Sequence, residues 1–159
     1  MTQQKTNQAG IDLIKEFEEL RLTAYPDPKT NGAPYTNGWG HTGPSIGPGT
    51  VWTEQQAEEA LREDLASFEA IIRKSVIVAL ADNQFSALVS IVFNVGPGSS
   101  RKDGIIVLKN QQPSTLLRKL NMADYAGAAA EFPRWCSPGT SVTNGLLRRR
   151  NAERALFES

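Results

Sequence analysis

The stretch Glu18–His41, EELRLTAYPDPKTNGAPYTNGWGH, decides the fold because helix-forming sequence stops inside it. The window 26–49 holds five of the nine prolines and six of the thirteen glycines, a density of helix breakers that no helix survives. Asn31-Gly32 is typical of a two-residue hairpin turn, in which both central residues take positive φ. With Leu22–Tyr25 and Tyr35–Trp39 as its strands, the stretch predicts a small antiparallel β-hairpin lobe.

Helical periodicity and capping residues flank this lobe on both sides. Asn7 is the predicted N-cap of a helix that runs to about Glu19, and Thr53-Glu-Gln-Gln56 has the form of a capping box opening a helix to about Lys74. Further helices are predicted over 83–95 (capped by Asp82 and ended by Gly96), 113–120, 124–132 and 143–157, with a candidate strand at Ile105–Leu108 in an otherwise irregular connection, 97–112. The fold class is therefore α+β, one domain over residues 1–159: an N-terminal helix (1–20), the β lobe (21–50) and a helical lobe (51–159).

Composition and charge exclude several classes of protein. The longest apolar runs, Ser75–Ala81 and Ala87–Val95, fall short of the roughly 18 apolar residues that a membrane-spanning helix needs. The polar start predicts no signal peptide and production in the cytosol. Because 17 basic residues balance 17 acidic ones, no overall positive field gathers polyanions. A single cysteine, Cys136, and a single histidine, His41, leave no intrachain disulfide and no Cys/His zinc site, so we expect no metal and no cofactor.

Glu18 stands out among the charges of the first predicted helix. At 100° per residue it falls inside the apolar arc formed by the leucine, isoleucine and phenylalanine side chains, whereas the neighbouring charges fall outside that arc: Asp12, Lys15, Glu16 and Glu19. Desolvation favours the protonated form of a carboxyl group, which is what a general acid needs near neutral pH. The alternative is a frayed helix end at which Glu18 points to water.

The other candidate residues are ordinary when each is taken alone. Asp27 lies between two prolines that fix its loop, and Asp-Pro also opens turns. Thr36 is a normal strand residue. His41, as a lone imidazole, is more often a structural hydrogen-bonding group than a catalytic base, and Asp64 on the next helix is its candidate partner.

Taken together, Glu18-Glu-Leu-Arg-Leu-Thr-Ala-Tyr-Pro-Asp27 and Tyr35-Thr36-Asn-Gly-Trp-Gly-His41 resemble the Glu, eight residues, Asp, spacer, Thr signature of phage-type lysozymes, glycoside hydrolase family 24. The resemblance continues in the family's order over nearly the whole chain, through the segments 84–96, 114–121, 124–132, 134–135 and 145–150. It implies a lysozyme-like fold, with the β-hairpin lobe and the larger helical lobe in the family's arrangement.

The resemblance implies a role for each candidate. Glu18 would be the general acid, Asp27 the ionised base or charge stabiliser, and Thr36 the residue that holds the attacking water. Contacts to the sugars would come from the Gly40 backbone, Phe93 and Asn94. His41 and Asp64 would support the site.

Two departures from the family pattern concern specific residues. The spacer between Asp27 and Thr36 has eight residues where five is commoner, which makes Thr30 a rival for the threonine role. The long 97–112 connection would alter the edge of the sugar groove.

The family also places an arginine of the last helix against the catalytic glutamate; alignment selects Arg148, and Arg149 lies one register away. The alternative is that the run Arg148–Arg150 with Arg154 is a solvated face.

The resemblance implies an endolysin: a muramidase that hydrolyses the β-1,4 bond between N-acetylmuramic acid and N-acetylglucosamine in peptidoglycan. It would act as a monomer, wait in the bacterial host's cytoplasm, and reach the periplasm when a holin opens the inner membrane. A lytic transglycosylase acting on the same bond is one alternative. A nucleic-acid-binding module that uses 145–157 as a basic recognition helix is another, and the zero net charge argues against it.

Overall fold

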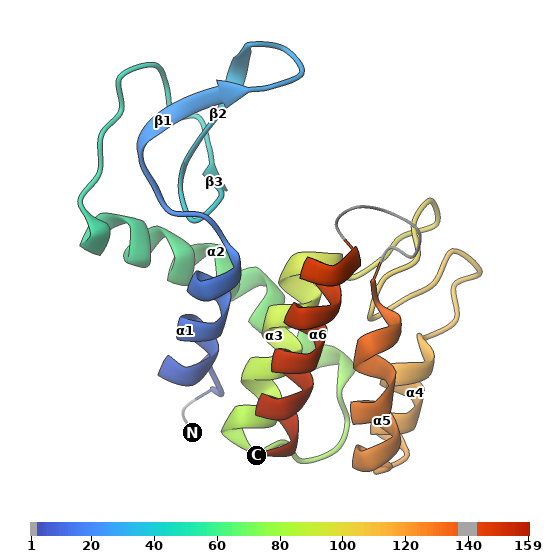
Figure 1. Cartoon of the computed structure of the whole chain (residues 1–159). Helices are drawn as coiled ribbons and strands as arrows, with labels where there is room; N and C mark the ends of the chain where they lie inside the picture. Colours follow the sequence, from blue (N-terminus) through green and yellow to red (C-terminus); the bar gives the residue numbers. More distant parts are fainter. Residues whose placement is uncertain (1–2, 137–142) are drawn as a thin grey trace. The chain divides into compact units, whose positions relative to one another are not determined.

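The computed structural model describes residues 3–136 and 143–159, which form six α-helices, one short 3-10 helix and a three-stranded antiparallel sheet (Figure 1). The first two residues of the polar N-terminal start lie outside the described residues. No described helix is both long and apolar enough to cross a bilayer. The elements are α1 (Gln8–Phe17), β1 (Arg21–Asp27), β2 (Gly32–Gly38), β3 (His41–Thr42), α2 (Glu54–Ser75), α3 (Asp82–Val95), α4 (Thr115–Asn121), α5 (Tyr125–Glu131), η1 (Phe132–Arg134) and α6 (Thr143–Glu158).

The chain divides into two compact units. The sheet unit is Ile14–Ser67, and the helical unit is Met1–Leu13 with Phe68–Ser159. The boundaries fall inside α1 and α2, whereas the sequence places the lobe boundaries at residues 20 and 51. Both helices contact the residues of the sheet region. Lys15 of α1 lies 4.7 Å from the centre of the Trp39 ring, and a Cβ on Gly38 would lie 3.4 Å from Ala57 of α2.

Helix ends follow the capping residues closely. The Asn7 side chain accepts the Gly10 N–H at 3.0 Å, and the Thr53 hydroxyl accepts the Gln56 N–H at 3.1 Å while the Gln56 side chain accepts the Thr53 N–H at 2.8 Å. Both predicted caps are thus confirmed. Asp82 is not a cap but the first residue of α3: Ala81 is the N-cap, and the Gln84 side chain accepts its N–H at 2.8 Å. Gly96 ends α3 at φ 101°, a conformation that favours glycine.

The hairpin turn differs from the one that Asn31-Gly32 predicts. The loop is Pro28–Asn31, and Asn31 takes φ 54° while Gly32 is the first residue of β2. The Asn31 N–H donates to the Asp27 carbonyl at 2.7 Å, which closes a turn over residues 27–31, whereas a type I′ turn at 31–32 would be closed between residues 30 and 33. The sheet also has a third strand, β3, that pairs with β2 and that the sequence pattern did not show.

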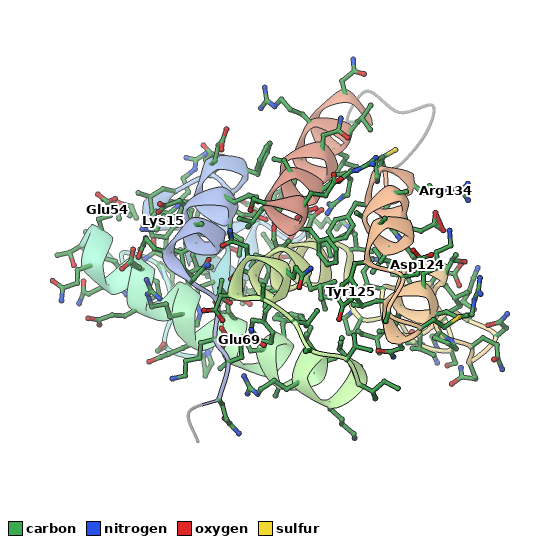
Figure 2. The ribbon with its side chains drawn as sticks, turned by 90° about the horizontal axis from the view of Figure 1, so that it is seen from below. Lys15, Glu54, Glu69, Asp124, Tyr125 and Arg134 are labelled. Atoms are coloured by element: carbon green, nitrogen blue, oxygen red, sulfur yellow. The ribbon has the colours of Figure 1, made fainter. Side chains whose placement is uncertain are left out.

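The helical unit is built around α3, whose residues Phe85–Val92 are all buried. Figure 1 shows α6 beside α3, and α4 beside α5. Ser114 caps α4 by accepting the Leu117 N–H at 3.1 Å. Asp124, labelled in Figure 2, caps α5 by accepting the Gly127 N–H at 2.9 Å. Also labelled in Figure 2 is Glu69 of α2, a buried carboxylate that accepts the Thr6 N–H at 2.7 Å and so ties the N-terminal segment to α2.

The connection 97–112 contains no strand, so the prediction of one at Ile105–Leu108 is wrong. The Ile105 N–H donates to the Gly96 carbonyl at 3.1 Å, and the Val107 N–H donates to the Pro97 carbonyl at 2.9 Å. These backbone groups are therefore satisfied by the connection itself and by the glycine that precedes it. Gly98 and Gly104 permit the close approach, because a Cβ on Gly104 would lie 2.1 Å from the Gly98 nitrogen.

Candidate active site

Glu18 lies just past the end of α1, where its backbone N–H still donates to the Ile14 carbonyl at 2.9 Å. Its side chain is half-buried, whereas Asp12, Glu16 and Glu19 are exposed. The helical wheel therefore predicts correctly that the Glu18 side chain is less exposed than those of the other three acidic residues. The helix ends two residues earlier than expected, and the continued hydrogen bond keeps Glu18 in helical register.

Lys15 also falls outside the apolar arc, a position typical of a solvated charge, but its side chain is engaged by other groups. Its ammonium pairs with the Glu58 carboxylate of α2 and lies 4.7 Å from the centre of the Trp39 ring. The lysine side chain is only 22% exposed as a result. This pair holds the pKa of Glu58 below its ordinary value, mainly through the hydrogen bond from Lys15.

Asp27 is the last residue of β1, and its carboxylate is part of the turn. Its Oδ1 accepts the Lys29 N–H at 2.7 Å, the geometry of an Asx turn. Forming the turn does not conflict with the catalytic role predicted for Asp27, because this hydrogen bond fixes the direction of the carboxylate. The side chain is half-buried at the edge of the loop.

Thr36 lies in the middle of the sheet. It is opposite Tyr25 of β1 and opposite Thr42 of β3. Paired residues of an antiparallel ladder share a face, so the Tyr25 and Thr36 side chains project from the same face. Asp27 lies two residues beyond Tyr25 on β1, across a register shift in the ladder, and pairs with Gly32. The extra residues of the spacer are accommodated in β2: Tyr25 to Asp27 on β1 is matched by Thr36 to Gly32.

Thr30, the rival for the threonine role, lies in the turn itself. Its hydroxyl donates to the Ala33 carbonyl at 3.0 Å and accepts the Gly32 N–H at 3.3 Å. These two bonds occupy the hydroxyl with its own loop. The assignment of the threonine role to Thr36 stays a prediction.

His41 and Asp64 form the expected pair, with Nδ1 2.8 Å from Oδ2. The imidazole also lies against the Trp52 ring, with ring centres 5.4 Å apart. These contacts tie β3 to α2. Gly40, next to His41, is exposed and takes φ 87°, which favours glycine at the turn between β2 and β3.

The remaining candidates belong to the helical unit. Phe93 is half-buried, with its ring edge-on to Phe68 at 5.5 Å, and Asn94 is exposed in the last turn of α3. Arg148 is exposed on α6, whereas Arg149 and Arg150 are buried. Glu18, Asp27, Thr36, Gly40, His41 and Asp64 all belong to the sheet unit. The expected contact between Arg148 and Glu18 joins residues of different units and stays a prediction.

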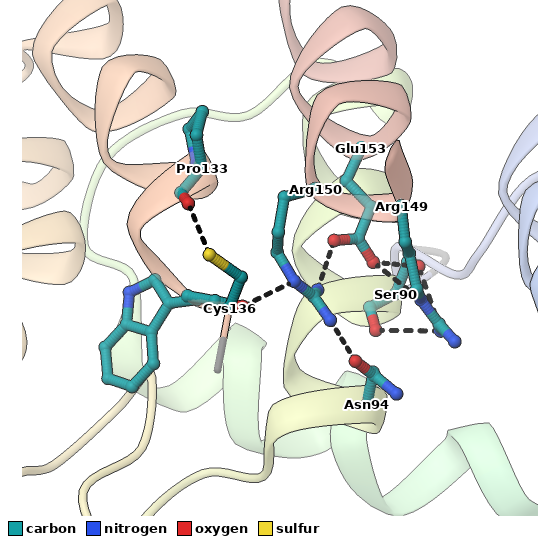
Figure 3. A network of polar contacts seen from close by, with 8 residues as sticks. Ser90, Asn94, Pro133, Cys136, Arg149, Arg150 and Glu153 are labelled. Atoms are coloured by element: carbon teal, nitrogen blue, oxygen red, sulfur yellow. Dashed lines mark hydrogen bonds and ion pairs between the residues drawn. The ribbon is translucent and has the colours of Figure 1, made fainter. Parts of the chain in front are cut away.

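A buried polar network in the helical unit was missed by sequence reasoning. The Glu153 carboxylate accepts from Arg149 Nε at 3.2 Å, from Arg150 Nη1 and from the Ser90 hydroxyl at 2.5 Å (Figure 3). The Arg148–Arg150 run is therefore not simply a solvated face. The available signal was the spacing: Arg149 and Arg150 precede Glu153 by four and three residues on one helix.

Burial and pairing act against each other in this network. Burial raises the pKa of Glu153 and lowers that of Arg150, while the attraction between the two groups opposes both changes. The Arg150 guanidinium keeps its charge despite this lowering, because arginine is not deprotonated in proteins.

A family profile described as Phage lysozyme matches residues 15–153 of this chain. The endolysin of Bacillus phage PZA is 45% identical over 153 residues, a match that covers 96% of this chain and 55% of that longer protein. This chain thus spans about half the length of that relative.

Two solved structures share the fold along their whole length. A variant of the P22 lysozyme is 35% identical with a TM-score of 0.79, and the match covers 100% of both chains. The muramidase domain of SpmX from Asticaccaulis excentricus is 33% identical with a TM-score of 0.78, and the match covers 98% of this chain and 99% of that one. The lysozyme-like α+β fold predicted from the sequence is confirmed.

Proposed function

This chain belongs to the phage lysozyme family, and from that premise we propose that it is a glycosidase that hydrolyses the β-1,4 bond between N-acetylmuramic acid and N-acetylglucosamine in bacterial peptidoglycan. One observation carries the proposal. Asp27 ends β1 and Thr36 pairs with Tyr25, two residues before Asp27, while half-buried Glu18 directly precedes the same small sheet in the same unit. Glycoside hydrolysis uses two carboxyl groups, and the sheet unit brings one at a helix end and one at a strand end together with a threonine hydroxyl.

Each residue has a defined part in the proposed reaction. Glu18 donates its proton to the departing glycosidic oxygen while the bond from that oxygen to the sugar's anomeric carbon breaks. Water, oriented by the Thr36 hydroxyl, attacks that carbon from the opposite face and gives a proton to Asp27. The negative charge of Asp27 also stabilises the cationic character of the transition state. The products are two shortened glycan strands, one with a new reducing end.

The relatives support this substrate. The related proteins are described as an endolysin, a lysozyme and a muramidase domain, and the family match includes all three proposed catalytic residues. The chain spans only part of its Bacillus phage relative, so we propose for it the glycosidase step and not every activity of the longer protein.

A lytic transglycosylase would attack the same bond but would form an anhydro sugar without using water. The presence of a threonine hydroxyl and the Asp27 carboxylate in one small sheet favours hydrolysis, because these groups are suited to binding a water molecule. The nucleic-acid-binding alternative is disfavoured by the burial of Arg149 and Arg150, since a recognition helix needs its basic side chains at the surface.

Two measurements test the proposal. The purified chain should reduce the turbidity of Gram-negative cells whose outer membrane has been permeabilised, and mass analysis of the released fragments should find reducing N-acetylmuramic acid ends. Anhydro ends, lighter by one water, would identify a transglycosylase. No fragments from purified peptidoglycan would contradict glycosidase activity altogether.

Access to the wall is part of the same proposal. The enzyme works as a monomer, stays in the host cytoplasm until a holin opens the inner membrane, and acts in the periplasm. Expression in a Gram-negative host should leave cells intact until the inner membrane is permeabilised. Lysis without permeabilisation would show that the chain reaches the wall by itself.

A further inference from the structure

The end of α3 is joined to α6 by one hydrogen bond between side chains of very different exposure. Arg150 is 0% exposed, whereas Asn94 is at the surface, and Nη2 of Arg150 donates to Oδ1 of Asn94 (Figure 3). The guanidinium is held from two other directions, by Glu153 and by the Trp135 carbonyl, which accepts from Nε at 2.9 Å. These bonds hold the Arg150 guanidinium in one position, and its bond to Oδ1 in turn fixes the orientation of the Asn94 amide.

The chemistry of the pair fixes which end of the amide faces out. A guanidinium has five N–H donors and no acceptor, so the amide can meet it only through its oxygen. The Nδ2 group then points away from Arg150. Asn94 and Arg150 both line a cavity of about 320 Å³, which Trp135 and Lys102 line as well. An outward N–H at this position can donate to an acceptor oxygen of a bound molecule, but cannot accept from a hydroxyl.

We propose that Arg150 is a positioning residue that holds Asn94 as a hydrogen-bond donor to an acceptor oxygen of the peptidoglycan, either a carbonyl on the glycan or a carbonyl or carboxylate on its peptide stem. The inference rests on the proposed function, which supplies the substrate. It assigns to Asn94 a direction that the family resemblance did not give, and to Arg150 a role beyond packing. A lysine could not replace this arginine, because a single ammonium lacks the planar fork that bonds Glu153, Trp135 and Asn94 together.

Asn94→Asp separates this role from a structural one. Aspartate still accepts from Arg150, now as an ion pair, but has no N–H to present outward. We expect the melting temperature to stay within about 3 °C of the wild type, while kcat/KM on soluble peptidoglycan falls by about 3- to 10-fold or more through a higher KM. Asn94→Ala should lose activity similarly without adding a charge. The matched control is Asn151→Asp, which places the same charge on an exposed position of α6 and should leave activity unchanged.

A purely structural Asn94 gives the opposite pattern. If it serves only to satisfy Arg150, Asn94→Asp keeps wild-type KM, and that result would overturn the inference. The wild type must cleave peptidoglycan in the same assay, so failure of the proposed function is seen separately. Arg150→Lys, assayed well below its own melting temperature, should show the same rise in KM; an unchanged KM would contradict the positioning role.

A binding measurement distinguishes the two sources of the acceptor. Two proteins are compared, Glu18→Gln alone and Glu18→Gln combined with Asn94→Asp. Each is titrated with glycan strands that have lost their stem peptides and with strands that keep them. Weaker binding of stripped strands to the Asn94→Asp protein places the acceptor on the glycan. A defect that is seen only with intact stems places it on the peptide. Equal binding of both ligands to both proteins would count against the proposal.

Discussion

Thr36 of β2 lies directly opposite Tyr25 of β1, two residues before Asp27 on the same strand. The ladder is irregular between these two positions of β1, because Asp27 pairs with Gly32, four residues before Thr36 on β2. Thr36 and Asp27 are thus held in one small sheet by neighbouring positions of β1. We expect a water molecule of the proposed reaction to bind between the threonine hydroxyl and the carboxylate.

Replacing Glu18 by Gln should abolish lysis without unfolding the protein. Loss of a general acid typically costs about 100-fold or more in rate. Glu16→Gln and Glu19→Gln are the controls, because both side chains are exposed on the same helix end. Turbidity assays and melting temperatures of all three variants check the prediction. An equal loss at Glu19 would show that the apolar arc does not identify the acid.

Thr36→Ala should reduce kcat sharply, since the water would lose its orienting hydroxyl. Thr30→Ala should be nearly silent for turnover, because the Thr30 hydroxyl bonds only within the turn, to Ala33 and Gly32. Steady-state kinetics on soluble peptidoglycan compare the two. If Thr30→Ala is the slower enzyme, the spacer shifts the motif and the assignment of Thr36 is wrong.

His41 should contribute to stability and not to proton transfer. His41→Asn loses the bond to Asp64 and the contact with Trp52, and a hydrogen bond to a charged group is worth about 1.5–3 kcal/mol, less where the pair is partly exposed. We expect a melting temperature lower by about 3–6 °C, with activity kept at a permissive temperature.

Asp64→Asn should have a similar effect on the melting temperature, and the double variant should add little to either single one, because both remove the same interaction. A well-folded but inactive His41→Asn enzyme would instead make this imidazole part of the catalytic machinery.

The Lys15–Glu58 pair predicts a pH dependence of stability. Because the folded protein lowers the pKa of Glu58 below its ordinary value of 4.5, the pair stabilises the fold above that value and ceases to do so as pH falls through the lowered one. Glu58→Gln should therefore lower the free energy of unfolding near neutral pH by less than about 1 kcal/mol, since the Glu58 side chain is 34% exposed.

This difference from the wild type should shrink as pH is lowered from about 6 towards 3. Urea unfolding across this range measures it. Glu63→Gln on the exposed side of α2 is the control, with no such trend expected. A difference that grows on acidification would mean that Glu58 is not stabilised in its ionised form.

The proposed reaction should invert the anomeric centre. In an inverting enzyme the two carboxyl groups stand about 6.5–9.5 Å apart, with room for the water that Thr36 orients, whereas a retaining one holds them about 5–5.5 Å apart. Proton NMR in the first minutes of hydrolysis, before mutarotation, identifies the new reducing end. An α product agrees with inversion. A β product would make Asp27 a nucleophile and remove the water-placing role of Thr36.

Local sequence determined much of the secondary structure. Asn7, the Thr53–Gln56 box, Gly96, Ser114 and Asp124 all act at the helix ends where their chemistry places them. The wheel of the first helix also set Glu18 apart from its neighbours. These features could be predicted because a cap or a helical face depends on residues only three or four positions apart.

Other features of the fold depend on contacts between residues far apart in the chain, and only the tertiary structure decided them. The sequence did not show β3, because two residues form a strand only when β2 is there to pair with them. It predicted a strand at 105–108 that is absent, since those backbone groups find partners at Gly96 and Pro97 instead. For the arginines of α6 it left open a solvated face or a contact with Glu18, and it did not show that Arg149 and Arg150 are buried. Burial of Arg150 follows from the packing of α6 against α3, which brings Glu153 to Ser90 and Arg150 to Asn94, 63 and 56 positions apart in the sequence. Charges are buried where such distant partners meet them, and no local pattern specifies that meeting.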